Sequence, residues 1–317
     1  MSRKVKIFSG KVTKILAEKI CKEFDGQPLN NLKLSRFSDG EFITDIKDTV
    51  RGCSAYVIQS LVPPADNIWE FLMIGDALKR ASAVERIACI PYLGYSRQDR
   101  KCNPREPISA KLLANILQSA GFTRIITIDL HSDQVQSFYD IPVDHLSANY
   151  VFIPYIKKLN LPNLMIGTPD VGGSKRAKKF ADVFNTDLVI CNKVRKQANE
   201  ISEMKIIGDV RGKDVILVDD LIDTAGTICK SADLMMENGA TSVRAVVTHP
   251  ILSGKAYENL EKSKLVELIT TDTIPLKQQL EKITVISIDK MLADAIQRIS
   301  DCESISSHFN WNKNEEE

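Results

Sequence analysis

The stretch Asp214–Lys230, DVILVDDLIDTAGTICK, constrains this chain most, because its residues follow the order of a strand, an acidic turn and a helix start. Val215–Val218 is a short apolar run rich in β-branched residues, which is typical of a strand buried on both faces of a parallel sheet. Two carboxylates, Asp219 and Asp220, stand at its carboxyl end. In open α/β sheets this end binds ligands, so we expect a functional site here.

The turn after these carboxylates has the composition of a phosphate-binding loop. It consists of small residues and hydroxyls around a glycine: Asp223, Thr224, Ala225, Gly226 and Thr227. The N–H groups of the next helix would face a ligand there, which suits a phosphate. Asp219 and Asp220 would then accept hydrogen bonds from sugar hydroxyls, so the expected ligand is a phosphorylated sugar. Helix capping explains one aspartate at such a place, but not three.

The composition is that of an ordinary globular protein. The chain has 317 residues, enough for two domains, and is 44% hydrophobic and 26% charged. A formal charge of +1 gives no reason to expect nucleic acid or an anionic membrane as a partner. No apolar run approaches membrane-spanning length, and the N-terminal apolar part is too short for a signal peptide. Seven scattered cysteines indicate a reducing compartment, and we expect a cytoplasmic protein.

Strand and helix patterns alternate along the chain, which predicts an α/β fold with mainly parallel sheets. The spacing of a strand near Val57 and a helix after Asn67 repeats in the strand near Val215 and the helix after Ala225. Two similar α/β halves would explain this repetition. We therefore predict two domains, residues 1–147 and 148–317.

The first informative loop is RFSDGE, in which Phe37 is followed by Asp39, Gly40 and Glu41. An exposed aromatic ring could stack on a purine while the acids accept hydrogen bonds from its amine. Asp39-Gly40 is also a strong β-hairpin signal. Both interpretations stay open, because loops on a rigid scaffold often carry function.

The second loop, Pro91–Pro107, follows a strand that ends at Ile90 and is rich in cations. It contains Arg97 and Gln98. A solvated surface loop is the simpler interpretation. Cations at the carboxyl end of a strand could instead hold a polyphosphate, for which arginine offers bidentate geometry.

Asp129 and His131 in TIDLHSDQ are two residues apart where a strand ends, so they share a face. A histidine in such a place is more often structural than a ligand. Because Mg²⁺ prefers oxygen donors and keeps waters, His131 could instead contact phosphate oxygens around the metal.

GTPDVGGSKRAKK, Gly167–Lys179, is a second strand-loop-helix pattern with the spacing of a phosphate loop. Gly173 stands where a P-loop requires lysine, which excludes a P-loop NTPase. Asp170 is placed to hold a metal bound to phosphates. We expect the cations of the following helix to form a solvated face: Lys175, Arg176, Lys178 and Lys179.

The polar segment Asn192–Gly212 precedes the sugar-phosphate strand and is interpreted as a mobile flap. Lys193 and Arg195 alternate like residues on one face of an extended segment. They could be an exposed basic edge that opposes aggregation. They could also be lid cations that meet a developing phosphoryl charge when the lid closes.

Six motifs, RFSDGE, YSRQDRK with PISAK, DLH, TPDVGG, NKVRKQANE and VDDLIDTAGT, occur in the order found in ribose-phosphate diphosphokinases, the PRPP synthetase family. The resemblance covers nearly the whole chain and is closest to the phosphate-activated class. It implies two phosphoribosyltransferase-like domains, a homohexamer, and inorganic phosphate and ADP as effectors. The implied reaction transfers diphosphate from MgATP to ribose 5-phosphate, with Mg²⁺ as cofactor.

The resemblance also implies roles for single residues. Phe37, Asp39, Gly40 and Glu41 would hold adenine, and Arg97 and Gln98 the ATP phosphates. His131 and Asp170 would lie at the Mg²⁺ and phosphate centre, and Lys193 and Arg195 would be catalytic. Asp219 and Asp220 would take ribose hydroxyls, and Asp223 to Thr227 the 5-phosphate, with Arg195 nearby. More loosely, Arg51 and Ser306 would belong to the effector site.

The chain departs from familiar members of this family at Cys102, Asn103, Pro104, Glu106 and Val194. We expect these departures to affect regulation and metal preference more than catalysis. Two rival functions share part of the pattern. A phosphoribosyltransferase that consumes PRPP would need neither RFSDGE nor the YSRQD loop, and a non-catalytic regulatory homologue would depart around the flap, where Lys193 and Arg195 are intact.

Overall fold

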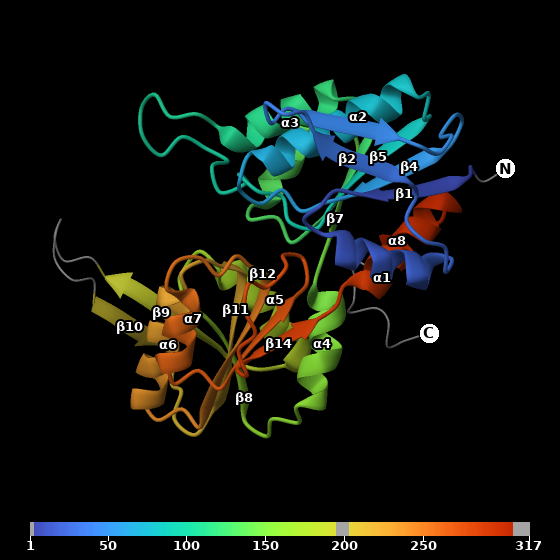
Figure 1. Ribbon diagram of the computed structural model, residues 1–317. Coiled ribbons are helices and arrows are strands. Elements are labelled where there is room, and N and C mark those ends of the chain that lie inside the picture. The colour runs from blue at the N-terminus through green and yellow to red at the C-terminus, as the bar shows by residue number, and fades with distance from the viewer. Residues whose placement is uncertain (1–2, 195–202, 307–317) are drawn as a thin grey trace. The chain divides into compact units, whose positions relative to one another are not determined.

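The computed structural model describes residues 3–194 and 203–306, except the side chains of residues 193, 194 and 203. The chain divides into two compact units (Figure 1). The first comprises residues 1–148, 273–275 and 287–317, and the second comprises residues 149–272 and 276–286. In each unit a sheet that is wholly or mostly parallel is flanked by helices, so the prediction of an α/β fold with two similar halves is confirmed.

The first unit is built on a five-stranded sheet in the order β1-β4-β5-β6-β7, and every neighbouring pair is parallel. These strands are β1 (Val5–Ser9), β4 (Ser54–Ile58), β5 (Glu85–Ile90), β6 (Arg124–Ile128) and β7 (Val143–Leu146). Its helices are α1 (Lys14–Phe24), α2 (Asp66–Arg80), α3 (Ser109–Ser119) and α8 (Asp289–Ser300), with the 3-10 helix η1 (Asp133–Phe138). Side chains of α2 and α3 enter one core with the sheet, in which the rings of Phe71 and Phe122 stack at 4.8 Å.

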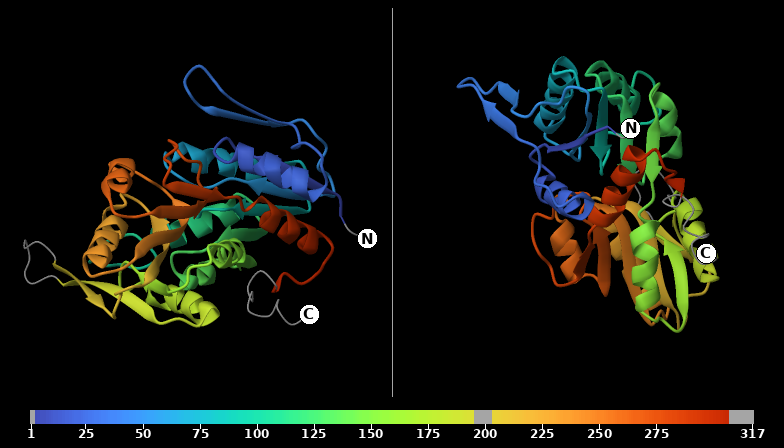
Figure 2. Two further views of the ribbon diagram at one scale, coloured as in Figure 1. Left: turned by 90° about the horizontal axis from the view of Figure 1, so that it is seen from below. Right: turned by 90° about the vertical axis from the view of Figure 1, so that its right-hand side faces the viewer.

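Two features of the first unit depart from a simple βα alternation. The strands β2 (Leu32–Arg36) and β3 (Phe42–Ile46) form a separate antiparallel hairpin that projects from the unit (Figure 2). Helix α8, from the end of the chain, packs against α1. A chain segment near residue 290 therefore belongs to the same packed unit as residues 14–24.

The second unit has a seven-stranded sheet in the order β10-β9-β8-β11-β12-β13-β14, in which only the described pair β9 and β10 is antiparallel. The strands are β8 (Leu164–Thr168), β9 (Leu188–Val194), β10 (Glu203–Ile207), β11 (Asp214–Ile222), β12 (Ser242–Pro250), β13 (Glu267–Thr271) and β14 (Ile283–Ile286). The helices are α4 (Asn149–Lys158), α5 (Ser174–Phe184), α6 (Gly226–Glu237) and α7 (Ala256–Lys262).

Strand β11 is central to this sheet and is covered on both faces. Val215 and Leu217 enter a core with α6 and α7, while the alternate residues Ile216 and Val218 are also buried, on the opposite face. Helix α5 contacts β11 and β8. Burial on both faces explains why this segment reads as a continuous apolar run.

The two sheets repeat one arrangement. Strand β4 lies between β1 and β5, and β11 lies between β8 and β12. Each is followed by a helix and then by its next neighbour in the sheet, β4 by α2 and β5, and β11 by α6 and β12. This is the repetition that the sequence spacing indicated.

Candidate active site

The carboxyl ends of β8 and β11 meet because these strands are parallel neighbours. Their pairing stops at Leu217, whereas β11 continues to pair with β12 as far as Ile222. The strand is therefore longer than the predicted run Val215–Val218, and Asp219 and Asp220 lie in the extension, where β11 pairs with β12 but no longer with β8. One edge of β11 is thus open beside the loop that follows β8.

Asp219 and Asp220 form an acidic pair in this extension. The N–H of Asp220 donates to Asp219 Oδ1 at 2.9 Å. Burial raises the pKa of Asp219, and the neighbouring Asp220 and Asp170 raise it further. A negative charge on this partly buried pair is costly, so groups that donate to carboxylates are favoured beside it.

The turn between β11 and α6 is held by hydrogen bonds from the segment after β12. The N–H of Ser253 donates to Asp223 O at 3.0 Å, and its hydroxyl donates to the Asp223 carboxylate. Asn259 Nδ2 donates to Thr224 O at 2.9 Å. Ala225, at φ 61°, has a left-handed backbone, and α6 begins with the next residue, Gly226. The predicted phosphate loop is thus a fixed turn at the N-terminus of a helix.

The loop after β8 is held by hydrogen bonds between its own residues. Asp170 Oδ1 accepts the N–H of Gly173 at 2.9 Å, and Thr168 Oγ1 donates to Asp170 O at 2.8 Å. A Cβ at Gly173 would lie 2.4 Å from Thr168 Oγ1, so a side chain there would require this hydroxyl to move. This close contact favours glycine at the position at which a P-loop has lysine.

One prediction for this region is wrong: Arg176 does not belong to a solvated cationic face. Its side chain is 24% exposed, and Nη1 lies 3.4 Å from Asp220 Oδ1. Lys178, two residues along α5, is 63% exposed and pairs with Asp182 on its own helix. Of these cations, Arg176 therefore faces β11, whereas Lys178 faces solvent. The sequence spacing alone did not predict this difference.

The predicted flap residues are only partly described. Lys193 lies in β9, paired in register with Met204 of β10, and its side chain lies outside the described residues, as does the whole of Arg195. The strand β10 was not predicted. The catalytic roles of Lys193 and Arg195 therefore stay predictions.

The predicted ATP and phosphate residues of the first unit follow β5 and β6, which are parallel neighbours. Arg97 and Gln98 are exposed in the loop after β5, and His131 is exposed after β6. Gln98 also has a local role, because it accepts the hydroxyl of Ser109 at the start of α3. Leu130 N–H donates to His145 Nε2 at 2.9 Å, which orients the turn that carries His131.

Phe37, Asp39, Gly40 and Glu41 form the connection of the β2–β3 hairpin, so the hairpin interpretation is correct. Gly40 has φ 95°, and the backbones of Phe37 and Glu41 are hydrogen-bonded at 2.9 Å. Asp39 Oδ1 accepts the N–H of Glu41 at 3.1 Å. Phe37 is 57% exposed, and its ring is available to stack on a planar ligand. Its predicted contact with adenine stays a prediction.

The two predicted metal residues lie in different units, His131 in the first and Asp170 in the second. Across residues 3–194 and 203–306, the structure shows no group of three or more His, Cys, Asp or Glu side chains arranged as a metal site. Mg²⁺ commonly takes much of its coordination from substrate and water oxygens. The metal-binding roles of His131 and Asp170 stay predictions.

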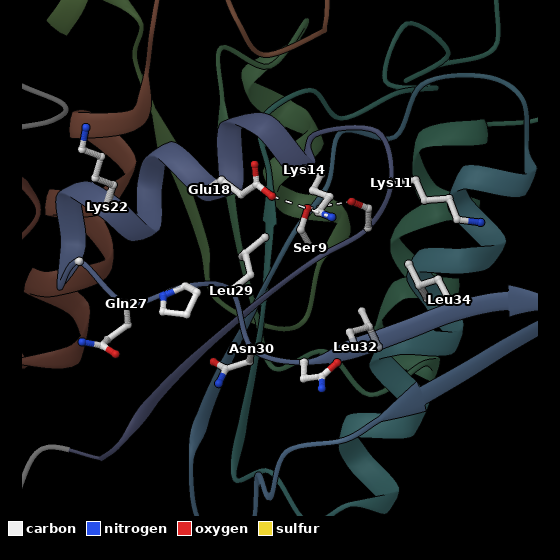
Figure 3. Close-up of a pocket in the computed structure, with 14 residues that line it drawn as sticks. Ser9, Lys11, Lys14, Glu18, Lys22, Gln27, Leu29, Asn30, Leu32 and Leu34 are labelled. Atoms are coloured by element: carbon white, nitrogen blue, oxygen red, sulfur yellow. Dashed lines mark hydrogen bonds and ion pairs between the residues drawn. The ribbon is translucent and has the colours of Figure 1, made fainter.

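A pocket of about 800 Å³ lies in the first unit between α1, the segment 26–31 and β2 (Figure 3). Lys11, Lys14, Lys22 and Glu18 line it, and Lys14 lies 3.9 Å from Glu18. None of the predicted site residues lines this pocket. This pocket is therefore separate from the predicted site residues.

Two α/β units, one of which carries an acidic pair and a phosphate-type turn at the carboxyl end of a central strand, are typical of enzymes that act on phosphorylated sugars. Residues 5–121 match the N-terminal domain of ribose phosphate pyrophosphokinase, and residues 177–310 match the phosphoribosyl synthetase-associated domain. This chain belongs to the ribose-phosphate pyrophosphokinase family, as its sequence motifs predicted.

Individual relatives support this assignment over the full length. The ribose-phosphate pyrophosphokinase of Porphyromonas gingivalis is 50% identical over 304 residues, 96% of this chain and 97% of the relative. That of Campylobacter jejuni is 50% identical over 308 residues, 97% of this chain and 99% of the relative. The crystal structure of phosphoribosylpyrophosphate synthetase from Mycobacterium smegmatis has a TM-score of 0.89 at 36% identity, covering 95% of this chain and 100% of that one.

The described part of the chain contains no helix long and apolar enough to cross a membrane.

Proposed function

We propose that this protein transfers the diphosphoryl group of MgATP to the C1 hydroxyl of ribose 5-phosphate, giving 5-phosphoribosyl 1-diphosphate and AMP. The observation that carries the proposal is the open extension of β11. It places Asp219 and Asp220 directly before the fixed turn Asp223–Thr227, in a chain of this family. The hydroxyl oxygen attacks the β-phosphorus, the bond from this phosphorus to the α,β-bridging oxygen breaks, and the hydroxyl proton is released.

The acceptor sugar is held by the second unit. Asp219 and Asp220 accept hydrogen bonds from ribose hydroxyls, and the turn Asp223–Thr227 takes the 5-phosphate through backbone N–H groups at the start of α6. Because Ser253 and Asn259 already hold this turn, little ordering is required when the phosphate binds. A sugar held at both ends has one orientation for its C1 hydroxyl.

The donor nucleotide is assigned to residues of the first unit. Phe37, Asp39 and Glu41 on the exposed hairpin contact adenine, and Arg97 and Gln98 contact the phosphates. Asp170, whose carboxylate accepts the N–H of Gly173, and the exposed His131 are the residues assigned to Mg²⁺, which takes much of its coordination from substrate and water oxygens. When bound, Mg²⁺ neutralises charge on the transferring phosphates.

Lys193 and Arg195 are assigned to stabilise charge on the transferring group. We expect Lys193→Ala to lower kcat by about a hundredfold or more while KM for ATP changes little, because a positioned cation acts mainly in the transition state. Steady-state kinetics on both substrates measure this. An unchanged kcat in both Lys193→Ala and Arg195→Ala would overturn the assignment.

Regulation and assembly are further parts of the proposal and depend on the family resemblance. Inorganic phosphate activates, ADP inhibits, and Arg51 and Ser306 belong to the effector site. The protein works as a homohexamer in the cytoplasm. Size-exclusion chromatography with light scattering measures the assembly, and phosphate titration in the activity assay measures the activation.

The deciding experiment measures AMP formation from MgATP with and without ribose 5-phosphate, at several phosphate concentrations. AMP that appears together with phosphoribosyl diphosphate, and only when the sugar is present, is the expected result. A folded protein that binds ATP but forms no AMP at any phosphate concentration would instead be a regulatory homologue. Release of diphosphate that depends on a nucleobase would identify a phosphoribosyltransferase.

A further inference from the structure

Arg176 is the cation of α5 that faces the acidic pair. It is the third residue of the helix, one turn after the loop that carries Asp170. Its Nη1 lies 3.4 Å from Asp220 Oδ1, and the two side chains are 24% and 10% exposed. Helix α5 packs on both β8 and β11, so the position of Arg176 relative to β11 is set by the packing of the unit.

A cation beside the acidic pair offsets part of its negative charge. Asp219 is half-buried, and the adjacent Asp220 is buried. Asp170 contributes a third negative charge nearby. Like charges at short distance in a region of low polarity repel strongly. A guanidinium stays protonated in proteins and donates from a planar fork, so it can offset this charge and fix the orientation of a carboxylate.

We propose that Arg176 is a positioning residue of the ribose 5-phosphate subsite: it orients the Asp220 carboxylate and offsets its charge so that the acidic pair can receive the ribose hydroxyls. This inference depends on the proposed function, since it concerns the same sugar. Arg176 acts through Asp220 and not on the transferring group. Loss of the guanidinium therefore weakens sugar binding, while ATP binding, assigned to the first unit, is retained.

The test compares three variants of the full-length protein. Arg176→Gln removes the charge, Arg176→Lys keeps the charge without the planar fork, and Lys178→Gln removes an exposed cation from the same helix. We expect Arg176→Gln to raise KM for ribose 5-phosphate by about tenfold or more, with KM for ATP changed less than about twofold. Arg176→Lys should recover part of the affinity, and Lys178→Gln should match the wild type.

A second measurement does not depend on turnover. Ribose 5-phosphate should raise the melting temperature of the wild type and of Lys178→Gln, and raise it much less in Arg176→Gln at the same sugar concentration. Circular dichroism and the melting temperature without ligand report whether each variant is folded. If Arg176→Gln does not fold, Arg176→Lys still tests the inference, because it retains the charge.

A double-mutant cycle with Asp220→Asn isolates the pair. If Arg176 acts through Asp220, Arg176→Gln should weaken sugar binding much less in the Asp220→Asn background than in the wild type. Equal losses in both backgrounds, or a wild-type KM for ribose 5-phosphate in Arg176→Gln, would overturn the inference. An equal rise in both KM values would also overturn it. Wild-type protein that forms no AMP with ribose 5-phosphate would overturn the proposed function instead.

Discussion

At the scale of single residues, Asp219 is assigned to sugar binding and lies in an environment that disfavours its charged form. Burial raises its pKa above the ordinary value of 3.8, and the neighbouring Asp220 and Asp170 raise it further. The folded protein therefore binds a proton at this carboxyl more tightly than the unfolded chain does. The stabilisation from this proton is complete below the unfolded pKa and is lost as the pH rises through the folded pKa.

The raised pKa of Asp219 predicts that Asp219→Asn stabilises the ligand-free protein, and more so at high pH. The reason is that the amide cannot acquire the unfavourable charge. Thermal unfolding of both proteins from about pH 6 to about pH 9 measures it: the melting temperature of the variant should exceed that of the wild type by a margin that grows with pH. The same variant should lose affinity for ribose 5-phosphate. A margin that shrinks as the pH rises would show that the carboxylate is well compensated in the folded protein.

At the scale of elements, the predicted binding residues of the second unit lie near the carboxyl ends of its parallel strands. A group of stabilising contacts lies near the amino ends. The acidic pair and the phosphate turn lie near the carboxyl end of β11. Near the amino end of β13, Glu267 accepts hydrogen bonds from Tyr155 at 2.7 Å and Thr284 at 2.6 Å, and lies 3.5 Å from Arg244. This second group, the Glu267 cluster, joins α4, β12, β13 and β14.

We expect Glu267→Ala to destabilise the protein by about 2–4 kcal/mol, because it leaves Arg244 partly buried without its carboxylate and removes the acceptor of two hydroxyls. Denaturant-induced unfolding measures this change. Both KM values should match the wild type well below the melting temperature. Lys262→Ala, which breaks an exposed pair with Glu258 on α7, is the control and should have little effect on stability. A changed KM for ribose 5-phosphate in Glu267→Ala would contradict the claim that the Glu267 cluster stabilises the fold without contributing to sugar binding.

At the scale of the whole molecule, burial divides the seven cysteines into two classes. Cys21, Cys53, Cys89, Cys191 and Cys229 are buried, and Cys102 and Cys302 are exposed. Burial raises the pKa of Cys21 to about 11, with Asp25 and Glu18 adding to the effect, and burial alone raises that of Cys89 to about 12. Since the thiolate is the reactive form, these two thiols are doubly protected.

A thiol reagent should therefore label only Cys102 and Cys302 in the native protein near neutral pH, and all seven cysteines in denaturant. Peptide mass spectrometry after labelling identifies the sites. Cys102→Ser and Cys302→Ser together should leave almost no rapid labelling, with activity retained if Cys102 has no catalytic role. Rapid labelling of Cys89 in the native protein would contradict the burial seen here.

Much of the fold and part of the site followed from local sequence. The buried run of β11, the phosphate-type turn, the hairpin at Asp39-Gly40 and the α/β repeat all depend on contiguous residues and were predicted. Helix α4, with Pro154 inside it, was not predicted, nor was β10, whose residues lie in the segment interpreted as a flap. Proline and polar composition oppose these elements locally, and contacts with the rest of the unit override that preference.

The sequence by itself determined which residue types occur in which order: a buried strand, two carboxylates, a glycine turn and a helix start can be recognised because they are neighbours in the chain. Only the tertiary structure decided which strands lie side by side, where β11 loses its partner β8, and that Arg176 faces Asp220 while Lys178 faces solvent. It also decided that α8 packs with α1. These outcomes depend on contacts between residues far apart in sequence, which local patterns do not specify.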